Sequence, residues 1–293
     1  MTTFAPPPPA PTSAPPPLSP GWRTAFRFVL IAGAVVLVVG ALASLGTVAW
    51  GISSFRVITD SKPLPAGMRS VVVDTGDTPV AIRITTDRDA REPRADLRMV
   101  NSTRAGAHPL AVKAEGGDTR IMISGESTPF LDWGRAGEMT LLLPPELARR
   151  LSVTTRQDNG IVFAQAGIDQ LIAHTDNGRV ILGGSARRIE VDTDNGDVVS
   201  RDPISVSESF TATADNGDVK VDFAEAPPRT IDITSDNGDV VIALPARGPY
   251  AVNASTDNGD TVVRVPQATD REKAAAVITA RSENGDVIIE DSR

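Results

Sequence analysis

The stretch 193-TDNGDV-198 decides the fold, because near copies of it recur along the chain as TDNGRV, ADNGDV, SDNGDV, TDNGDT and ENGDV. The glycines of the seven Asn-Gly pairs are spaced 18, 18, 21, 21, 21 and 26 residues apart. A period near about twenty residues is typical of solenoids and other repeat arrays. A catalytic motif normally occurs once, so we interpret the repeated pair as a structural corner. The corner residues are Asn159, Gly160, Asn177, Gly178, Asn195, Gly196, Asn216, Gly217, Asn237, Gly238, Asn258, Gly259, Asn284 and Gly285.

Apolar residues alternate in front of each corner. The residue six positions before every Asn is apolar, and the residue two positions before it is mostly small. In the repeat of Asn195, Ile189 stands six positions before the Asn, Val191 four and Thr193 two. A spacing of two places these side chains on one face of a strand, which we expect to be buried. Beyond the corner, apolar positions restart three and five residues after the Asn, as in Val219 and Val221. Each repeat therefore predicts a strand, an Asn-Gly corner, a second strand and a return loop.

Two all-β folds fit this pattern. Glycine tolerates positive φ and asparagine is the next best residue for it, so the pair predicts a sharp turn. In a parallel β-solenoid (β-helix or β-roll) the corners stack in a column, whereas in an antiparallel β-meander each pair is a hairpin turn. The hairpin would place Asp194 opposite Asp197, and like charges directly opposite destabilise a strand pair. Stacked Asn side chains can instead exchange amide hydrogen bonds at about 4.8 Å. We favour the solenoid over the meander.

The first part of the chain predicts a tail and a membrane anchor. Residues 1–21 hold nine prolines and no charge, which predicts a disordered polyproline-rich spacer or, alternatively, a PxxP ligand. Residues 28–52 carry no charge and are long enough for one transmembrane helix. Trp22 and Trp50 flank this segment, where indole rings prefer the headgroup region. Ala41-Leu42-Ala43 leaves a cleaved signal peptide as the alternative.

The rest of the chain predicts a single β-rich ectodomain. We expect an irregular β start over residues 53–140 and the repeat solenoid over residues 141–293. Arg23 and Arg27 before the apolar segment nearly balance Arg56 and Lys62 after it. The β-rich remainder favours a cytoplasmic N-terminus and an extracytoplasmic C-terminal domain.

Charge and composition exclude several kinds of protein. All 37 acidic residues lie after Ile52, and the remainder of the chain carries 27 basic residues, so its net charge is 27 minus 37, or −10. A nucleic-acid partner is not expected, because binding phosphates needs clustered Lys and Arg. The chain has no cysteine, which excludes disulfides and cysteine-ligated metals.

The sequence contains few candidates for chemistry. His108 and His174 are the only histidines, and we interpret His174 as a solvated surface residue. No G-x-S-x-G, P-loop or HExxH pattern occurs, so we expect neither an enzyme nor a cofactor. The stacked corner carboxylates could hold Ca²⁺, although the G-G-x-G-x-D signature is lacking and Ile161 and Arg179 replace two of them. These carboxylates belong to Asp197, Asp218, Asp239, Asp260 and Asp286, with Asp194, Asp215, Asp236 and Asp257 nearby.

The segment 141-LLLPPELARRLSVTTRQDNG-160 and repeats such as 189-IEVDTDNGDVV-199 resemble a known family. It is the bacterial domain-of-unknown-function family labelled "putative adhesin", which is related to auto-transporter adhesin head domains. The resemblance covers residues 141–290 well and 69–140 loosely, and implies a β-helical or β-roll ectodomain on a membrane anchor. We therefore expect a non-catalytic binding or scaffolding module whose partner is an envelope protein or a glycan. A carbohydrate-active β-helix enzyme and a regulatory envelope-stress component are the alternatives.

Overall fold

The computed structural model describes residues 30–31, 33–42, 44, 55–102, 109–123, 137–224 and 226–292. The chain divides into two compact units, Met1–Ser54 and Phe55–Arg293. The described residues of the first unit, between 30 and 44, are helical. The predicted tail 1–21 and part of the predicted membrane segment 28–52, including residues 45–52, lie outside the described residues. Among the residues that are described, no helix has both the length and the apolar character needed to cross a membrane.

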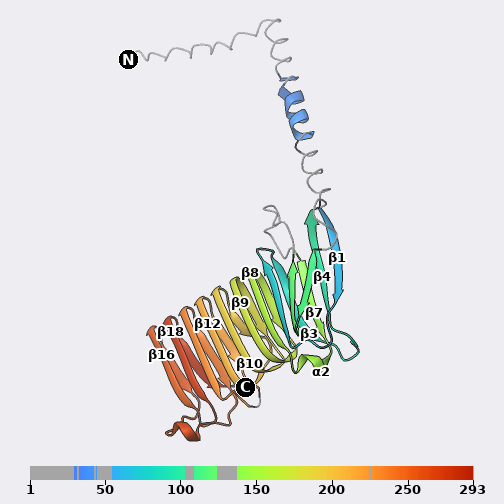
Figure 1. The fold of residues 1–293 in the computed structure, drawn as a ribbon. Helices are drawn as coiled ribbons and strands as arrows, with labels where there is room; N and C mark the ends of the chain where they lie inside the picture. The colour runs from blue at the N-terminus through green and yellow to red at the C-terminus, as the bar shows by residue number, and fades with distance from the viewer. Residues whose placement is uncertain are drawn as a thin grey trace, which may run out of the picture. The chain divides into compact units, whose positions relative to one another are not determined.

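The second unit is a stack of rungs, and each rung has one strand before the corner and one after it (Figure 1). In β8 and β9 the chain stays in one strand through the corner. The strands are β2 (Ser70–Gly76), β3 (Val80–Thr86), β8 (Ser152–Ala164), β9 (Gly167–Leu182), β10 (Ser185–Asn195), β11 (Val198–Ser200), β12 (Ser205–Asn216), β13 (Val219–Asp222), β14 (Thr230–Asn237), β15 (Val240–Leu244), β16 (Ala251–Asn258), β17 (Thr261–Arg264), β18 (Val277–Asn284) and β19 (Val287–Asp291).

Neighbouring rungs pair in parallel and in register, which confirms the predicted solenoid and shows that the meander is wrong. Asn195 aligns with Asn177 on one side and with Asn216 on the other. Val198 aligns with Val180 and Val219 in the same way. Strands before the corner form the pre-corner sheet, and strands after it form the post-corner sheet. The parallel arrangement avoids the opposed Asp pairs that a hairpin would impose.

The last two rungs are stacked in the reverse of their chain order. β18 pairs with β14 on one side and with β16 on the other, so the C-terminal rung is inserted and β16–β17 forms the end of the stack (Figure 1). The post-corner sheet has the same order, with β19 between β15 and β17. Thr261 stands where the interior rungs have a buried valine, such as Val240 or Val287. The more polar rung is therefore the one left at the open end.

The opposite end of the stack is closed by antiparallel strands. β1 (Phe55–Pro63) pairs with β4 (Arg94–Ser102), and β4 pairs with β7 (Gly137–Leu143). β5 (Leu110–Glu115) pairs with β6 (Asp118–Ile123). The short helix α2 (Pro145–Ala148) buries Leu147 and Ala148 before β8 begins. A 3-10 turn, η1 (Arg271–Lys273), lies in the connection between β17 and β18.

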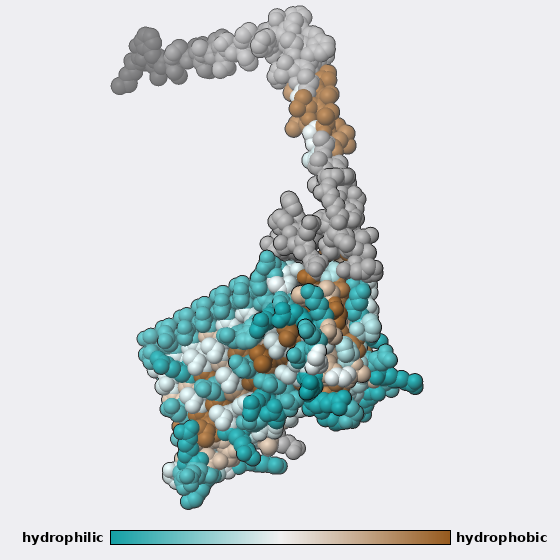
Figure 2. Space-filling model, in the orientation of Figure 1, coloured by the Kyte–Doolittle hydropathy of each residue, from teal (hydrophilic) through white to brown (hydrophobic). Residues whose placement is uncertain are grey.

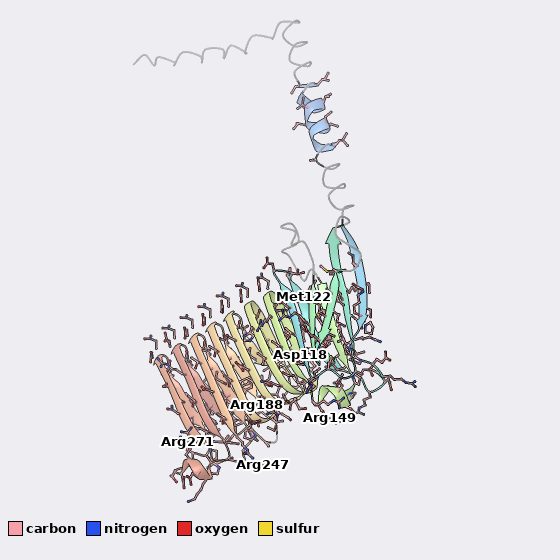
Figure 3. All side chains as sticks on the ribbon, in the orientation of Figure 1. Asp118, Met122, Arg149, Arg188, Arg247 and Arg271 are labelled. Atoms are coloured by element: carbon pink, nitrogen blue, oxygen red, sulfur yellow. The ribbon has the colours of Figure 1, made fainter. Side chains whose placement is uncertain are left out.

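The inward side chains of both sheets pack into one hydrophobic cluster between them. Most are Val, Ile and Leu, and the Phe210 and Phe223 rings meet edge to face at 5.4 Å. The Tyr250 hydroxyl is buried and donates to the Pro245 carbonyl. Polar corner residues make a continuous teal row along one edge of the solenoid in Figure 2. In Figure 3 their side chains repeat along that edge, while Arg188, Arg247 and Arg271 lie toward the opposite edge.

Candidate functional site

The corner asparagines form a ladder of side-chain hydrogen bonds along the edge of the solenoid. From Asn195 onward, each Nδ2 donates to the Asn Oδ1 of the preceding rung, for example from Asn216 to Asn195 at 3.1 Å and from Asn237 to Asn216 at 3.1 Å. The ladder follows the spatial order of the rungs, because Asn284 donates to Asn237 and Asn258 donates to Asn284, each at 3.0 Å. Asn159 is aligned with Asn177 in the first rung of the series.

An aspartate stands two positions after five of the seven corner asparagines and also links neighbouring rungs. Its Oδ1 accepts a hydrogen bond from the backbone N–H of the equivalent aspartate in the next rung. The N–H of Asp239 lies 2.9 Å from Asp218, the N–H of Asp286 lies 3.0 Å from Asp239, and the N–H of Asp260 lies 2.9 Å from Asp286. We call Asp197, Asp218, Asp239, Asp286 and Asp260 the acidic column. One carboxylate oxygen per rung therefore has a structural role.

Close packing requires a glycine at every corner, whereas the positive φ that the Asn-Gly pair predicted occurs at Gly160, Gly259 and Gly285 only. No described asparagine has positive φ, and neither Gly196 nor Gly217 does. A Cβ built on Gly196 would lie 1.5 Å from the carbonyl oxygen of Gly178, and one on Gly217 would lie 2.1 Å from that of Gly196. The chain passes the corner as a bent, extended strand, and any side chain at this position would overlap the neighbouring rung.

A calcium site is not formed by the described corner residues. Within the part of the chain that the structure describes, no group of three or more His, Asp or Glu side chains has a metal-binding arrangement. The aspartate directly before the Asn contributes to the corner hydrogen bonds through its backbone in three rungs. The carbonyls of Asp194, Asp215 and Asp236 accept from Asn Nδ2 groups at 3.3 to 3.4 Å. Asp257 instead accepts from Arg281 at 3.3 Å.

Four carboxylates gather near the first corners. Asp77 hydrogen-bonds to the side chain of Asp158, and this contact raises the pKa of Asp158 above its ordinary value. Desolvation raises the same pKa further, as do the negative charges of Asp77, Asp176 and Asp74. Asp158 and Asp176 directly precede corner asparagines, so this acidic group lies at the first corners of the stack.

Only one of the two histidines lies within the described residues. His174 is partly exposed on the pre-corner sheet, with Nδ1 3.7 Å from Oδ2 of Asp192. His108 lies outside the described residues.

The outer face of the post-corner sheet carries an apolar stripe that the sequence reasoning missed. Its members stand four positions after each corner Asn and are aligned across successive rungs. A single basic residue, Lys220, interrupts the line between Val199 and Val241. We define the apolar stripe as Phe163, Ile181, Val199, Val241, Ile288 and Val262.

A sequence signal for this stripe exists. After the corner the apolar residues follow one another without interruption, as in 180-VIL-182, 240-VVIAL-244 and 287-VII-289. Before the corner, apolar and polar residues alternate. A continuous apolar run is typical of a strand covered on both faces. In the solenoid the core covers only one of those faces. The other face holds half-buried Val199, Val241 and Ile288 in contact with solvent.

The outer face of the pre-corner sheet has a different chemistry. Its outward positions hold mainly polar residues in the same rungs, such as Thr213, Thr234 and Asp192. These side chains are exposed or half-buried. The two outer faces therefore differ, and the post-corner face is the one with unpaired apolar surface.

A shallow pocket of about 330 Å³ lies on the post-corner face at the capped end. The Arg83 guanidinium lies over the Phe163 ring, 4.8 Å from its centroid, and its Nε donates to Glu138 at 2.7 Å. Val57 and Val100 complete the apolar lining and are 59% and 36% exposed. The pocket extends the apolar stripe at its N-terminal end.

A second hollow of about 650 Å³ lies at the return-loop edge, and its charges are already paired. Arg187 donates to both carboxylate oxygens of Asp169 at 2.9 Å and to Glu208 at 2.5 Å. The guanidinium groups of Arg188 and Arg187 lower the pKa of Glu208 to about 2. Arg187 likewise holds the pKa of Asp169 below its ordinary value. These residues link three neighbouring rungs and have little capacity left for a ligand.

The chain is similar to a known protein family and to several solved structures. A family model described as Toastrack DUF4097 matches residues 71–290. A putative adhesin from Bacteroides fragilis is 12% identical, with 81% of this chain and 97% of that chain covered and a TM-score of 0.43. A putative cell adhesion protein from Clostridium sporogenes is 10% identical, with 81% and 100% covered and a TM-score of 0.38. A putative lipid binding protein from Parabacteroides distasonis is 12% identical, with 80% and 95% covered and a TM-score of 0.38. None of the curated proteins matches the chain.

Proposed function

Because the chain belongs to the Toastrack DUF4097 family, we propose that it is a non-catalytic, adhesin-like binding or scaffolding module of the bacterial cell envelope. The post-corner face is the binding face in this proposal. One observation carries it: the apolar stripe runs across successive rungs on this face, while the equivalent positions of the pre-corner face are polar. A solvent-facing apolar surface that spans several strands is typical of an interaction site.

The chemistry of the stripe favours a protein partner over a glycan. Sugar rings pack well on exposed aromatic side chains, but the stripe is aliphatic except for Phe163, and Arg83 covers that ring. Aliphatic side chains on a flat sheet suit the packing of another apolar protein surface.

The proposal includes a membrane anchor at residues 28–52. This segment is uncharged and of spanning length, and Trp22 and Trp50 flank it. In this arrangement the N-terminus is cytoplasmic and the β unit is extracytoplasmic.

Single-cysteine labelling tests the topology, since the chain has no cysteine of its own. Thr213→Cys is exposed on the β unit, and Thr12→Cys lies in the tail. A membrane-impermeant maleimide applied to spheroplasts should label the Thr213→Cys protein, and should label the Thr12→Cys protein only after lysis. Labelling of both proteins before lysis would refute the topology.

Site-specific photo-crosslinking tests the binding face. A photoreactive phenylalanine analogue replaces Val241 on the post-corner face or Thr234 on the pre-corner face of the same rung. In cells producing the full-length chain, the Val241 probe should give crosslinked adducts of defined mass and the Thr234 probe should not. Equal adducts from both positions, or adducts from Thr234 alone, would reject the proposed face.

A further inference from the structure

The last three rungs of the stack combine the apolar stripe with the acidic column. Val241, Ile288 and Val262 are neighbours across β15, β19 and β17, and each is half-buried. Two residues before each of them stands an aspartate on the same outer face. The aliphatic line is therefore bordered by a parallel line of carboxylates. These carboxylates belong to Asp239, Asp286 and Asp260.

These three carboxylates keep charge available for a partner. Asp239 and Asp286 each use one oxygen to accept a backbone N–H, at 3.0 and 2.9 Å. Within the described part of the chain, none of the three forms an ion pair, whereas Asp218 pairs with Lys220 and Asp197 pairs with Arg179. The negative charge at this end of the face is thus uncompensated.

Lys220 shows how a basic side chain sits on this face. It occupies a position in line with the apolar stripe, and its Nζ reaches Oδ2 of Asp218 at 2.6 Å. The hydrogen bond to Asp218, with the added negative charges of Asp239 and Asp197, raises the pKa of Lys220. An ammonium group above the stripe is therefore held by the acidic column. In the last three rungs the equivalent positions are aliphatic, so the basic groups would have to come from the partner.

The spacing of the carboxylates fits a sheet better than a single strand. One aspartate stands on each rung, and adjacent strands are separated by about 4.8 Å. A partner sheet stacked face to face, with its strands aligned to β15, β19 and β17, repeats at the same interval and can place one basic residue opposite each aspartate. The same face of a second copy would bring carboxylate to carboxylate, and an anionic lipid surface would also be repelled.

We propose that this face takes a partner protein sheet whose facing side carries aliphatic and basic side chains in alternation along each strand, two residues apart in sequence. The aliphatic side chains pack on Val241, Ile288 and Val262, and the basic groups pair with Asp239, Asp286 and Asp260. The inference rests on the proposed function, since it names the class of partner for the same face.

Synthetic peptides supply the test. The purified full-length chain is titrated with three short β-forming peptides. Every second residue of each peptide is Thr, and the positions between, which share one face, alternate Val with Lys, Val with Glu, or Ser with Lys. The Val-Lys peptide should bind, and the other two should bind about tenfold more weakly or less, because each lacks one of the two matching features. Equal binding of the Val-Lys and Val-Glu peptides, or no binding of the Val-Lys peptide, would overturn the inference.

A charge-matched pair of variants locates the contact. The triple variant Asp239→Asn, Asp286→Asn and Asp260→Asn removes three charges but keeps an Oδ1 acceptor for the backbone N–H groups, so the fold should persist. It should weaken binding of the Val-Lys peptide about tenfold. The control carries Asp194→Asn, Asp215→Asn and Asp236→Asn on the other side of the corner, and should bind as the unmodified chain does. Equal losses in both variants would mean a diffuse charge effect and would refute the site.

The outcome separates this inference from the proposed function. If the Val241 probe crosslinks in cells but the Val-Lys peptide fails to bind, the binding face stands and the basic partner is wrong. If the peptide binds and only Thr234 crosslinks in cells, the face is not the one used in the cell, and both proposals fall.

Discussion

At the scale of single residues, several positions of each corner form hydrogen bonds with the neighbouring rung, and each position uses a different chemical group. The Asn side chain bonds to an Asn side chain, and the Asp carboxylate accepts a backbone N–H. In the later rungs the hydroxyls of Ser235 and Ser282 donate to the corner-glycine carbonyls of the rungs that precede them, at 3.0 and 2.9 Å. The corner is thus a set of parallel hydrogen-bond ladders, and this explains why a nearly constant sequence recurs.

The position of an Asn in the ladder should set the cost of removing it. Asn216 both donates to Asn195 and accepts from Asn237, whereas Asn258 at the end of the stack only donates. We expect Asn216→Ala to lower the free energy of unfolding by about 1 to 2 kcal/mol and Asn258→Ala by about half as much. Urea denaturation of the two variants measures the difference. Equal losses would show that the ladder bonds contribute little.

The corner glycine should tolerate no side chain. Gly196→Ala places a Cβ 1.5 Å from the Gly178 carbonyl oxygen, which rigid neighbouring rungs cannot accommodate. We expect a loss of about 4 kcal/mol or more, or failure to fold. Gly67→Ala is the control, because a Cβ there meets nothing within 4 Å. Circular dichroism and thermal unfolding of both variants give the comparison.

Asp158 should make stability depend on pH. Its contact with Asp77 raises its pKa in the folded state above the unfolded value, so the folded protein binds the proton more tightly. The repulsion therefore destabilises the fold above the folded pKa and disappears as the pH falls through it. Asp158→Asn should raise the Tm at pH 7, and the gap to the unmodified protein should close in acid. A gap that is constant with pH would contradict this, and Asp194→Asn serves as the charge-matched control.

At the scale of strands, burial depends on a rung's place in the stack and not on its place in the chain. Val287 of β19 is fully buried, while Val263 of β17 is half-buried at the open end. We expect Val287→Ala to cost about 2 kcal/mol and Val263→Ala about half of that. If the rungs were stacked in chain order, β17 would be interior and the two costs would be reversed. Chemical denaturation of the two variants decides between these orders.

At the scale of the whole molecule, the repeat predicted the parallel solenoid well. Three features were enough to predict this fold: the period, the apolar alternation before each corner, and the opposed Asp pairs that a hairpin would create. They were enough because they describe contacts between equivalent residues. The reversed order of the last rungs was missed, since either order aligns Asn237, Asn258 and Asn284 equally well. Thr261 in place of a valine was the signal for it. The apolar stripe was missed because the apolar residue four positions after most corner asparagines was not separated from the buried ones beside it.

The whole solenoid should be indifferent to calcium. The acidic column already accepts hydrogen bonds from backbone N–H groups, and the described residues form no metal-binding group. We expect the same Tm with EGTA and with millimolar Ca²⁺, measured on the full-length chain. A rise of several degrees with Ca²⁺ would show that the carboxylates bind it.

The inserted C-terminal rung affects how the protein can be made. A solenoid stacked in chain order can add each rung as it leaves the ribosome, but here β16–β17 emerges before the rung that must lie beneath it. Until residues 277–291 are released, β14 and β15 pair with β12 and β13 on one side but lack their final neighbours on the other. A nascent chain halted just before this segment should therefore expose the edge of β14 and β15, and the synthesis of residues 277–291 becomes the event that closes the stack.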